Sequence, residues 1–292
     1  MQHTLGWIGL GYMGNPMTKN LLKAEYHVNV YNRSADKAAP LVDAGAVQLD
    51  SPKEIVEKSD VIFLMLSNTK AIEAVLTEDN GVLEADLHSK IIVNMSTIAP
   101  DEAIEFAKMI EEKGGTYVDA PVSGSVGVAQ TGQLVVLAGG DAEVVKTLKP
   151  YFDVLGKETI HFGPSGKASA AKLSINLLLG IVGQGVGETL LLGEKFGLEK
   201  EKILEMISQS GMNTPLFQGK KDMYRNEEFP AAFKVELMSK DLGLVKNEVD
   251  RMEGIYPLAE AVNQTYREAK ENGKGELDMG AVYLELKEKN QR

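Results

Sequence analysis

Short apolar runs alternate with stretches of helical periodicity through the first half of the chain. Several runs are apolar at every position, which is typical of parallel strands that helices cover on both faces. Repeated strand–helix units of this kind predict a doubly wound α/β domain of the Rossmann type. We expect its strands at Leu5–Leu10, Val28–Tyr31, Val61–Leu66, Ile91–Met95, Tyr117–Val118, Leu134–Ala138 and Ile160–Phe162.

The pattern changes after about Gly163, where strand signals end. A helical stretch without proline runs from Lys167 to about Lys195, so we predict two domains, residues 1–164 and 165–292, joined by one long helix. The second domain should be all-α, with further helices at Glu199–Ser208, Ala231–Glu253, Leu258–Asn272 and Asp278–Lys287.

Three glycines lie on roughly one side of the long helix, at positions 180, 183 and 187. Each glycine costs up to about 1 kcal/mol inside a helix, so we expect them to allow close packing against another helix. That helix belongs either to the same chain or to a second subunit. The second case is consistent with the homodimer or homotetramer that we expect.

The amino-acid composition disfavours several kinds of partner and site. The 42 acidic and 31 basic residues give a net charge of -11, which disfavours nucleic acid and anionic membranes as partners. Cysteine is absent and the four histidines are scattered, so we expect neither disulfides nor a metal site. The chain begins without a signal-peptide pattern and shows no membrane-spanning apolar run. We therefore expect a cytoplasmic enzyme.

A G-x-G-x-x-G motif follows the first expected strand and opens the next helix. Gly9 would permit the tight turn, Gly11 would let a pyrophosphate approach the backbone, and Gly14 would let the helix pack on the strand. The flanking strand and helix match a dinucleotide-binding unit. We predict that this loop, which also includes Leu10, Tyr12 and Met13, binds the cofactor.

The end of the second expected strand favours a phosphorylated cofactor. NAD-dependent enzymes usually carry a carboxylate here for the ribose 2′-hydroxyl, whereas this chain has Asn32. Arg33, Ser34 and Lys37 follow, and two cations with a hydroxyl suit a 2′-phosphate. We predict NADP(H) as the preferred cofactor, with NAD(H) possible. The alternative is that Arg33 is an ordinary surface residue.

Three further segments contain polar residues that could bind a substrate or react with it. Asp119–Ser125 follows a strand, and its hydroxyls and glycine amide could bind a carboxylate or could simply form a turn. Lys172 and Asn176 lie four residues apart on one helix face, so the amide can orient the ammonium, although such a lysine can also reach for solvent. Lys240-Asp241 is either part of a site or an exposed helix face.

Taken together, these motifs resemble those of the β-hydroxyacid dehydrogenases, the family of 3-hydroxyisobutyrate dehydrogenase. Gly9-x-Gly11-x-x-Gly14-x-x-Met17 is similar to the family's cofactor signature, and Asp119–Ser125 is similar to its substrate signature. Lys172-x-x-x-Asn176 and Lys240-Asp241 resemble its catalytic and late lysine segments. The four motifs occur in the family's order along essentially the whole chain.

The resemblance implies roles for individual residues. Lys172 would be the catalytic residue and Asn176 its companion, whereas Ser123 and Gly124 would bind a substrate carboxylate. Other residues are implied to lie at the cofactor (Met65, Leu66, Thr97 and Lys240) or beside the substrate (Phe233 and Asp241). One departure is Ala168, where the family often has a second glycine before the catalytic lysine.

Two segments, Phe152–Lys157 and Asn213–Phe217, resemble the glyoxylate/succinic semialdehyde reductase branch. This likeness implies NADPH-dependent reduction of a small carboxylate-bearing aldehyde, with the reverse oxidation possible. The alternatives are a 3-hydroxyisobutyrate dehydrogenase or a tartronate semialdehyde reductase. An imine reductase usually lacks the catalytic lysine, and a non-catalytic nucleotide-binding protein would not need Lys172, Asn176 and Ser123.

Overall fold

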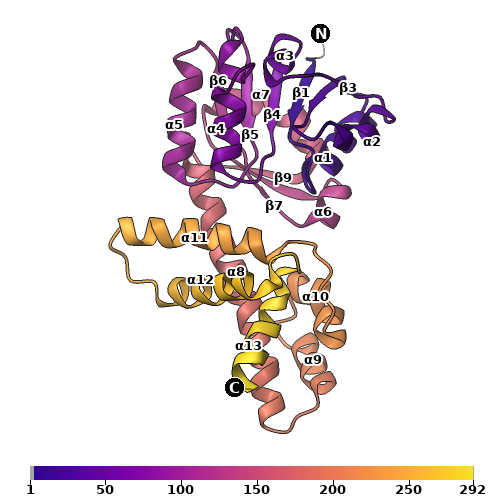
Figure 1. The fold of residues 1–292 in the computed structure, drawn as a ribbon, viewed down its shortest axis with the longest axis vertical. Coiled ribbons are helices and arrows are strands. Elements are labelled where there is room, and N and C mark those ends of the chain that lie inside the picture. The colour runs from indigo at the N-terminus through magenta and orange to yellow at the C-terminus, as the bar shows by residue number, and fades with distance from the viewer. Residues whose placement is uncertain (1–2, 292) are drawn as a thin grey trace. The chain divides into compact units, whose positions relative to one another are not determined.

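The computed structural model describes residues 3–291. Its internal contacts divide the chain into two compact units between Lys172 and Leu173. Helix α8 (Lys167–Lys195) runs through this division, and the boundary predicted after residue 164 lies just ahead of it. Strands and helices make up the indigo-to-magenta part of the chain, and helices fill the orange and yellow part (Figure 1).

The first unit is built on a six-stranded sheet whose pairings are all parallel. Its strands lie in the order β3-β2-β1-β4-β5-β6, which confirms the predicted doubly wound fold. The direction of winding reverses between β1 and β4, and sheets of this type bind ligands at the carboxyl ends of such strands. The strands are β1 (Leu5–Ile8), β2 (Val28–Tyr31), β3 (Val47–Gln48), β4 (Val61–Leu64), β5 (Ile91–Asn94) and β6 (Thr116–Asp119).

Both faces of this sheet are buried, as the fully apolar runs predict. Trp7 and Phe63 enter a core with α1 and α7, whereas the adjacent Ile8 and Ile62 enter a second core with α3, α4 and α5. Strand residues therefore alternate between two helix layers. The helices of this unit are α1 (Gly14–Lys23), η1 (Ala35–Ala38), α2 (Ala39–Val42), α3 (Pro52–Glu57), α4 (Thr69–Thr77), η2 (Val82–Glu84), α5 (Pro100–Glu111), α6 (Val126–Gln130) and α7 (Ala142–Leu155).

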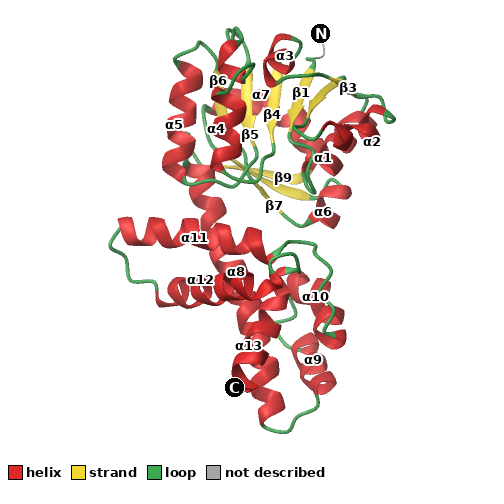
Figure 2. Cartoon of the chain, in the orientation of Figure 1, coloured by secondary structure: helices red, strands yellow, loops and turns green. Residues whose placement is uncertain are grey.

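A second, three-stranded sheet completes the first unit (Figure 2). It contains β7 (Val122–Ser123), β8 (Leu134–Ala138) and β9 (Gly156–His161). β7 pairs with β8 antiparallel, and β8 pairs with β9 parallel. The hydrophobic pattern predicts β8 and the end of β9, but it gives no sign that they leave the main sheet.

The described part of the second unit is helical apart from a single bridge between Lys234 and Asp278, which confirms the predicted all-α domain. Its helices after α8 are α9 (Lys200–Gln209), α10 (Pro215–Asn226), α11 (Val235–Arg251), α12 (Pro257–Ala269), the π-helical turn η3 (Lys270–Lys274), η4 (Met279–Ala281) and α13 (Val282–Gln291). The hydrophobic pattern does not predict α10. It starts at a proline, and the Thr214 hydroxyl caps it by accepting from the Phe217 amide at 3.2 Å.

The glycines of α8 face helices of the same chain. A Cβ on Gly180 would lie 2.9 Å from Met238 of α11, and one on Gly183 would lie 2.6 Å from the Tyr266 hydroxyl of α12. By length and composition α8 could cross a membrane, as core helices of soluble proteins also could.

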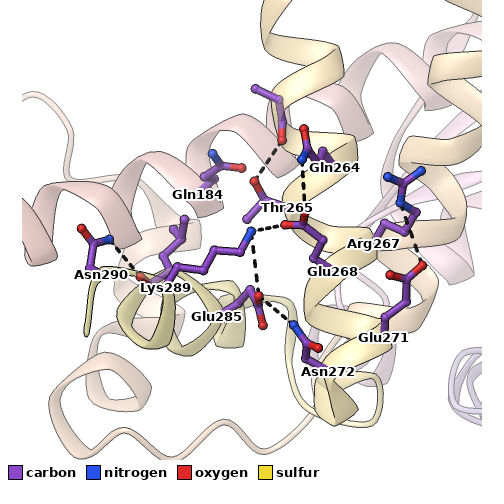
Figure 3. Close-up of polar contacts among 12 residues, drawn as sticks. Gln184, Gln264, Thr265, Arg267, Glu268, Glu271, Asn272, Glu285, Lys289 and Asn290 are labelled. Atoms are coloured by element: carbon purple, nitrogen blue, oxygen red, sulfur yellow. Dashed lines mark hydrogen bonds and ion pairs between the residues drawn. The ribbon is translucent and has the colours of Figure 1, made fainter. Parts of the chain in front are cut away.

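Polar contacts also join the last helices of the second unit. Figure 3 shows Lys289 of α13 reaching Glu268 of α12 and approaching Glu285. The buried Glu285 carboxylate accepts hydrogen bonds from Asn272 at 2.9 Å and from Lys274 at 3.0 Å. Because buried charges need partners, this network fixes α13 against the turn that follows α12.

Candidate active site

The three glycines of the loop between β1 and α1 have different surroundings. Gly9 has a φ of +101°, and a Cβ there would lie 2.3 Å from the Met65 carbonyl oxygen. A Cβ on Gly14 would lie 2.0 Å from the Gly9 carbonyl oxygen. A Cβ on Gly11 would meet no non-neighbouring heavy atom within 4 Å among residues 3–291. Gly9 and Gly14 therefore shape the loop, and Gly11 leaves the backbone open to a ligand such as a pyrophosphate.

Side chains from the sheet hold this loop in place. The buried Trp7 indole Nε1 donates a 3.0 Å hydrogen bond to the Gly9 carbonyl, and its ring stacks on Phe63. The Leu10 amide donates to Oδ1 of Asn32 at 2.9 Å. The loop is thus ordered by the protein itself, which lowers the entropic cost of binding a cofactor.

Asn32 connects the two halves of the predicted nucleotide site. Its Oδ1 accepts from the loop at Leu10, and its Nδ2 donates to the Ser34 carbonyl at 2.9 Å. Asn32, which stands in place of the usual carboxylate, therefore uses its side chain to hold the backbone at this corner. Arg33, Ser34 and Lys37 are exposed around it, and so is Asp36.

An open hollow of ≈ 720 Å³ lies beside the glycine loop in the first unit. Three lysines line it, Lys19 and Lys23 from α1 and Lys37 from η1, so it favours anions. Lys19 and Lys23 are not among the residues predicted from the sequence, although their spacing of four residues just after the glycine motif places both on one face of the helix. The other lining residues are Leu10, Gly11, Tyr12, Asn15, Pro16, Asn20, Val126 and Gln130.

A polar network orders the carboxyl ends of β4 and β5 and extends to β6. The Leu66 amide donates to the Ser96 hydroxyl at 2.9 Å, and the Ser96 amide donates to Oδ1 of Asn94 at 3.0 Å. Nδ2 of Asn94 in turn donates to the Tyr117 hydroxyl at 3.0 Å. Burial raises the pKa of Tyr117 far above its usual range, so the hydroxyl remains neutral. Met65 and Thr97, each next to a residue of this network, occupy the same sheet edge as Gly9.

The predicted substrate segment runs from β6 into β7. Ser123 is the last residue of β7 and is partly exposed. Gly124 has a φ of +144°, and a Cβ there would lie 2.7 Å from Leu134 and 2.9 Å from Val128. Only glycine fits such a position, and it leaves the backbone next to Ser123 accessible. The two residues thus lie together, after the β6 strand of the same unit.

The predicted catalytic pair lies on α8. Lys172, the last residue of the first unit, is partly buried, and Asn176 is 1% exposed. Nδ2 of Asn176 donates a 2.6 Å hydrogen bond to Oδ2 of Asp241 on α11. An amide that donates through Nδ2 accepts through Oδ1, so this bond sets which atom Asn176 can offer to an ammonium.

The second unit contains two further predicted residues, Lys240 on α11 and Phe233 in the segment before that helix. Lys240 Nζ lies 2.9 Å from the other carboxylate oxygen of Asp241. Phe233 is in the segment before α11, where its amide donates to Asp278 at 3.1 Å. Asn176, Lys240 and Asp241 therefore form one cluster, whereas Phe233 is held separately by Asp278.

Two family models match the chain in succession. Residues 4–163 match the NAD binding domain of 6-phosphogluconate dehydrogenase. Residues 166–286 match the model described as NAD-binding of NADP-dependent 3-hydroxyisobutyrate dehydrogenase.

Individual proteins match over nearly the full length. Glyoxylate/succinic semialdehyde reductase 1 of Arabidopsis thaliana is 35% identical, covering 97% of this chain and 98% of the relative. The 2-hydroxy-3-oxopropionate reductase of Escherichia coli is 32% identical, covering 97% and 96%. The structure of Mycobacterium tuberculosis 3-hydroxyisobutyrate dehydrogenase with L-serine superposes with a TM-score of 0.88 at 28% identity, covering 98% and 99%.

Proposed function

Because the chain belongs to the β-hydroxyacid dehydrogenase family of NAD(P)-dependent oxidoreductases, we propose that it reduces a short aldehyde acid with NADPH. Glyoxylate and succinic semialdehyde are the proposed substrates, and each would yield its hydroxy acid. The observation that carries the proposal is Lys172 on α8, one turn before an asparagine that Asp241 holds at 2.6 Å.

The first unit offers the residues for the nucleotide. Gly11 presents open backbone, and Leu10 and Asn32 hold the loop and the corner after β2 together. Arg33 is proposed to bind the 2′-phosphate, because guanidinium–phosphate hydrogen bonds are charge-assisted and position 32 has no carboxylate to repel the phosphate. When bound, NADPH supplies the hydride.

Lys172 is proposed to supply the proton. Hydride addition at a carbonyl carbon leaves negative charge on the oxygen, and a donor within about 3 Å can neutralise it. Asn176 is proposed to orient the ammonium through its amide oxygen. In the direction of oxidation Lys172 would take the hydroxyl proton back.

The substrate carboxylate is proposed to bind at Ser123 and Gly124, with Lys240 as a further cation. Gly124 leaves a backbone amide accessible next to the Ser123 hydroxyl. Lys240 Nζ lies 2.9 Å from Asp241 on α11, and the resemblance to the family also implies that Lys240 contacts the cofactor. Phe233 is proposed to limit the length of the substrate.

A substrate panel tests this proposal. The kcat/KM with NADPH is measured for glyoxylate, succinic semialdehyde, methylmalonate semialdehyde, tartronate semialdehyde, a cyclic imine and butanal. We expect succinic semialdehyde to exceed butanal by at least roughly tenfold, because butanal lacks the charged group that the site would bind. Equal kcat/KM for succinic semialdehyde and butanal would contradict the proposal that Ser123 binds the substrate carboxylate. A higher kcat/KM for the cyclic imine would indicate an imine reductase.

We also propose that the protein is a homodimer or homotetramer. The glycines of α8 pack within the chain, so they do not support this proposal, but the opposite side of the helix does. There Leu178 and Leu192 are 54% and 58% exposed, and Phe196, immediately after the helix, is 75% exposed. Light scattering of the wild type and of Leu192→Glu tests it: a monomeric wild type would contradict the proposal.

A further inference from the structure

The carboxylate of Asp119 is buried at the end of β6, where it is 1% exposed. One oxygen accepts a 3.1 Å hydrogen bond from the Gly166 amide. The other accepts from the Ser169 amide at 2.9 Å and from the Ser169 hydroxyl at 3.1 Å. All of these residues belong to the first unit.

These donors lie at the start of α8, with Gly166 just before the helix and Ser169 in its first turn. The first amides of a helix have no partner inside the helix and are usually capped by a nearby side chain. Gly166 stands immediately before α8 and has no side chain to offer. Asp119, 47 residues earlier in the chain, takes over that function. Its negative charge also suits the positive end of the helix dipole.

The main chain of Asp119 is equally constrained. Its amide and carbonyl pair with Gly139 at 3.1 and 2.8 Å, and a Cβ on Gly139 would lie 2.5 Å from the Asp119 carboxylate. Asp119 is the last residue of β6, and the chain continues from it into β7 with Ser123 and then to Gly124. Asp119 thus connects the proposed carboxylate-binding segment to the helix turn that precedes Lys172.

We propose that Asp119 is a positioning residue that acts through Lys172. Ser169 and Lys172 are three residues apart on α8, so they lie on one side of the helix. By fixing Ser169, Asp119 sets where the Lys172 ammonium stands relative to Ser123. This inference rests on the proposed catalytic role of Lys172. Proton transfer is sensitive to displacements of about 1 Å, so a shifted first turn lowers turnover.

A double-mutant cycle tests the proposal. The asparagine variant Asp119→Asn keeps the shape but turns an NH2 group towards one of the three donors. We expect it to lower kcat by about 10- to 100-fold in the wild-type background, by misplacing Lys172. In the Lys172→Ala background, measured in single turnovers, it should change the rate less than about twofold, because the effects of residues that act as a unit are not additive.

Binding and control measurements separate this role from a purely structural one. NADPH affinity, followed by quenching of the single tryptophan Trp7, should stay within about twofold. Asp141→Ala removes a comparable cap, on α7, where the carboxylate accepts from the Glu143 and Val144 amides at 2.9 and 3.0 Å. It should cost about 1 kcal/mol of stability and leave kcat unchanged.

Two results would overturn the inference. Asp119→Asn could lower turnover equally in the wild-type and Lys172→Ala backgrounds, or it could lower turnover in neither. Near-normal turnover in Lys172→Ala alone would instead overturn the proposed function. If Asp119→Asn does not fold, Ser169→Ala replaces it in the same cycle. That variant removes one of the three hydrogen bonds, and we expect a loss of about 3- to 10-fold in the wild-type background only.

Discussion

Asn176 and Asp241 are joined by a 2.6 Å hydrogen bond between two nearly inaccessible side chains of α8 and α11. A buried carboxylate that accepts from an amide fixes the amide's orientation, because the reverse orientation would bring two acceptors together. The companion of the proposed catalytic lysine is therefore itself held by a charged residue. The resemblance to the family implies a position beside the substrate for Asp241, and the structure adds this contact with Asn176.

The first prediction concerns that contact. Asp241→Ala should lower kcat by about 10- to 100-fold with little change in KM for the aldehyde acid, because Asn176 loses its orienting partner. Steady-state kinetics measure both constants. Asp250→Ala is the control on the same helix, since Asp250 makes an exposed pair with Lys246. A raised KM with unchanged kcat would show that Asp241 binds substrate and does not position Asn176.

The second prediction separates two glycines of the nucleotide loop. Gly11→Ala should leave the melting temperature unchanged and raise the Kd for NADPH at least about tenfold, because its Cβ enters only the space proposed for the cofactor. Gly14→Ala should destabilise the protein by about 2 kcal/mol or more, because its Cβ would overlap the Gly9 carbonyl. Thermal unfolding and Trp7 quenching distinguish the two effects. Unchanged NADPH binding in Gly11→Ala would place the cofactor elsewhere.

The third prediction concerns the choice of cofactor. Arg33→Ala should weaken NADPH binding by about 1.5–3 kcal/mol and leave NADH binding nearly unchanged, because only NADPH carries the 2′-phosphate. The KM values for both cofactors provide the measurement. Lys53→Ala, at an exposed salt bridge with Glu84 on α3 and η2, is a charge-matched control. Equal use of NADPH and NADH by the wild type would contradict the NADP preference.

The fourth prediction is a pH dependence of stability. Burial by itself would raise the pKa of Glu227, but hydrogen bonds from Lys200 and Lys287 outweigh it and lower this pKa to about 2. The folded-state pKa lies below the ordinary value of 4.5, so this stabilisation is complete above pH 4.5 and is lost as the pH falls towards 2.

Glu227→Gln should therefore destabilise the protein at pH 7 by about 1 kcal/mol, a modest value because the network is partly exposed to solvent. The difference from the wild type should shrink below pH 4.5. Urea unfolding at pH 7, 4 and 3 measures it, with the exposed neighbour Glu228→Gln as control. If the difference in free energy of unfolding between Glu227→Gln and the wild type stays constant with pH, the effect comes from packing and not from the charge of Glu227.

Local sequence signals predict much of the fold and of the nucleotide loop. The long helix α8 is one example, since the stretch without proline from Lys167 to about Lys195 predicts its bounds. The glycine motif is another, because Gly9 and Gly14 have local steric reasons and Gly11 leaves the backbone open. The two-residue strand β7 is too short to show periodicity, and nothing local distinguishes the strands of the small sheet from those of the large one.

Long-range polar contacts could not be predicted in the same way. The bonds of Asp119 to Gly166 and Ser169 span 47 and 50 residues, and that of Asn176 to Asp241 spans 65. Their partners share no spacing or pattern along the chain. The sequence therefore identifies candidate site residues, whereas the contacts that hold them emerge only from the fold.

The central claim is that Lys172 donates the proton during reduction. The most direct measurement is kcat for succinic semialdehyde with NADPH in Lys172→Ala, alongside Lys167→Ala, which removes an exposed lysine from the first turn of the same helix. We expect Lys172→Ala to lose about 100-fold or more in kcat while it binds NADPH normally, and Lys167→Ala to behave like the wild type. Near-normal turnover in Lys172→Ala, with NADPH bound, would contradict the account.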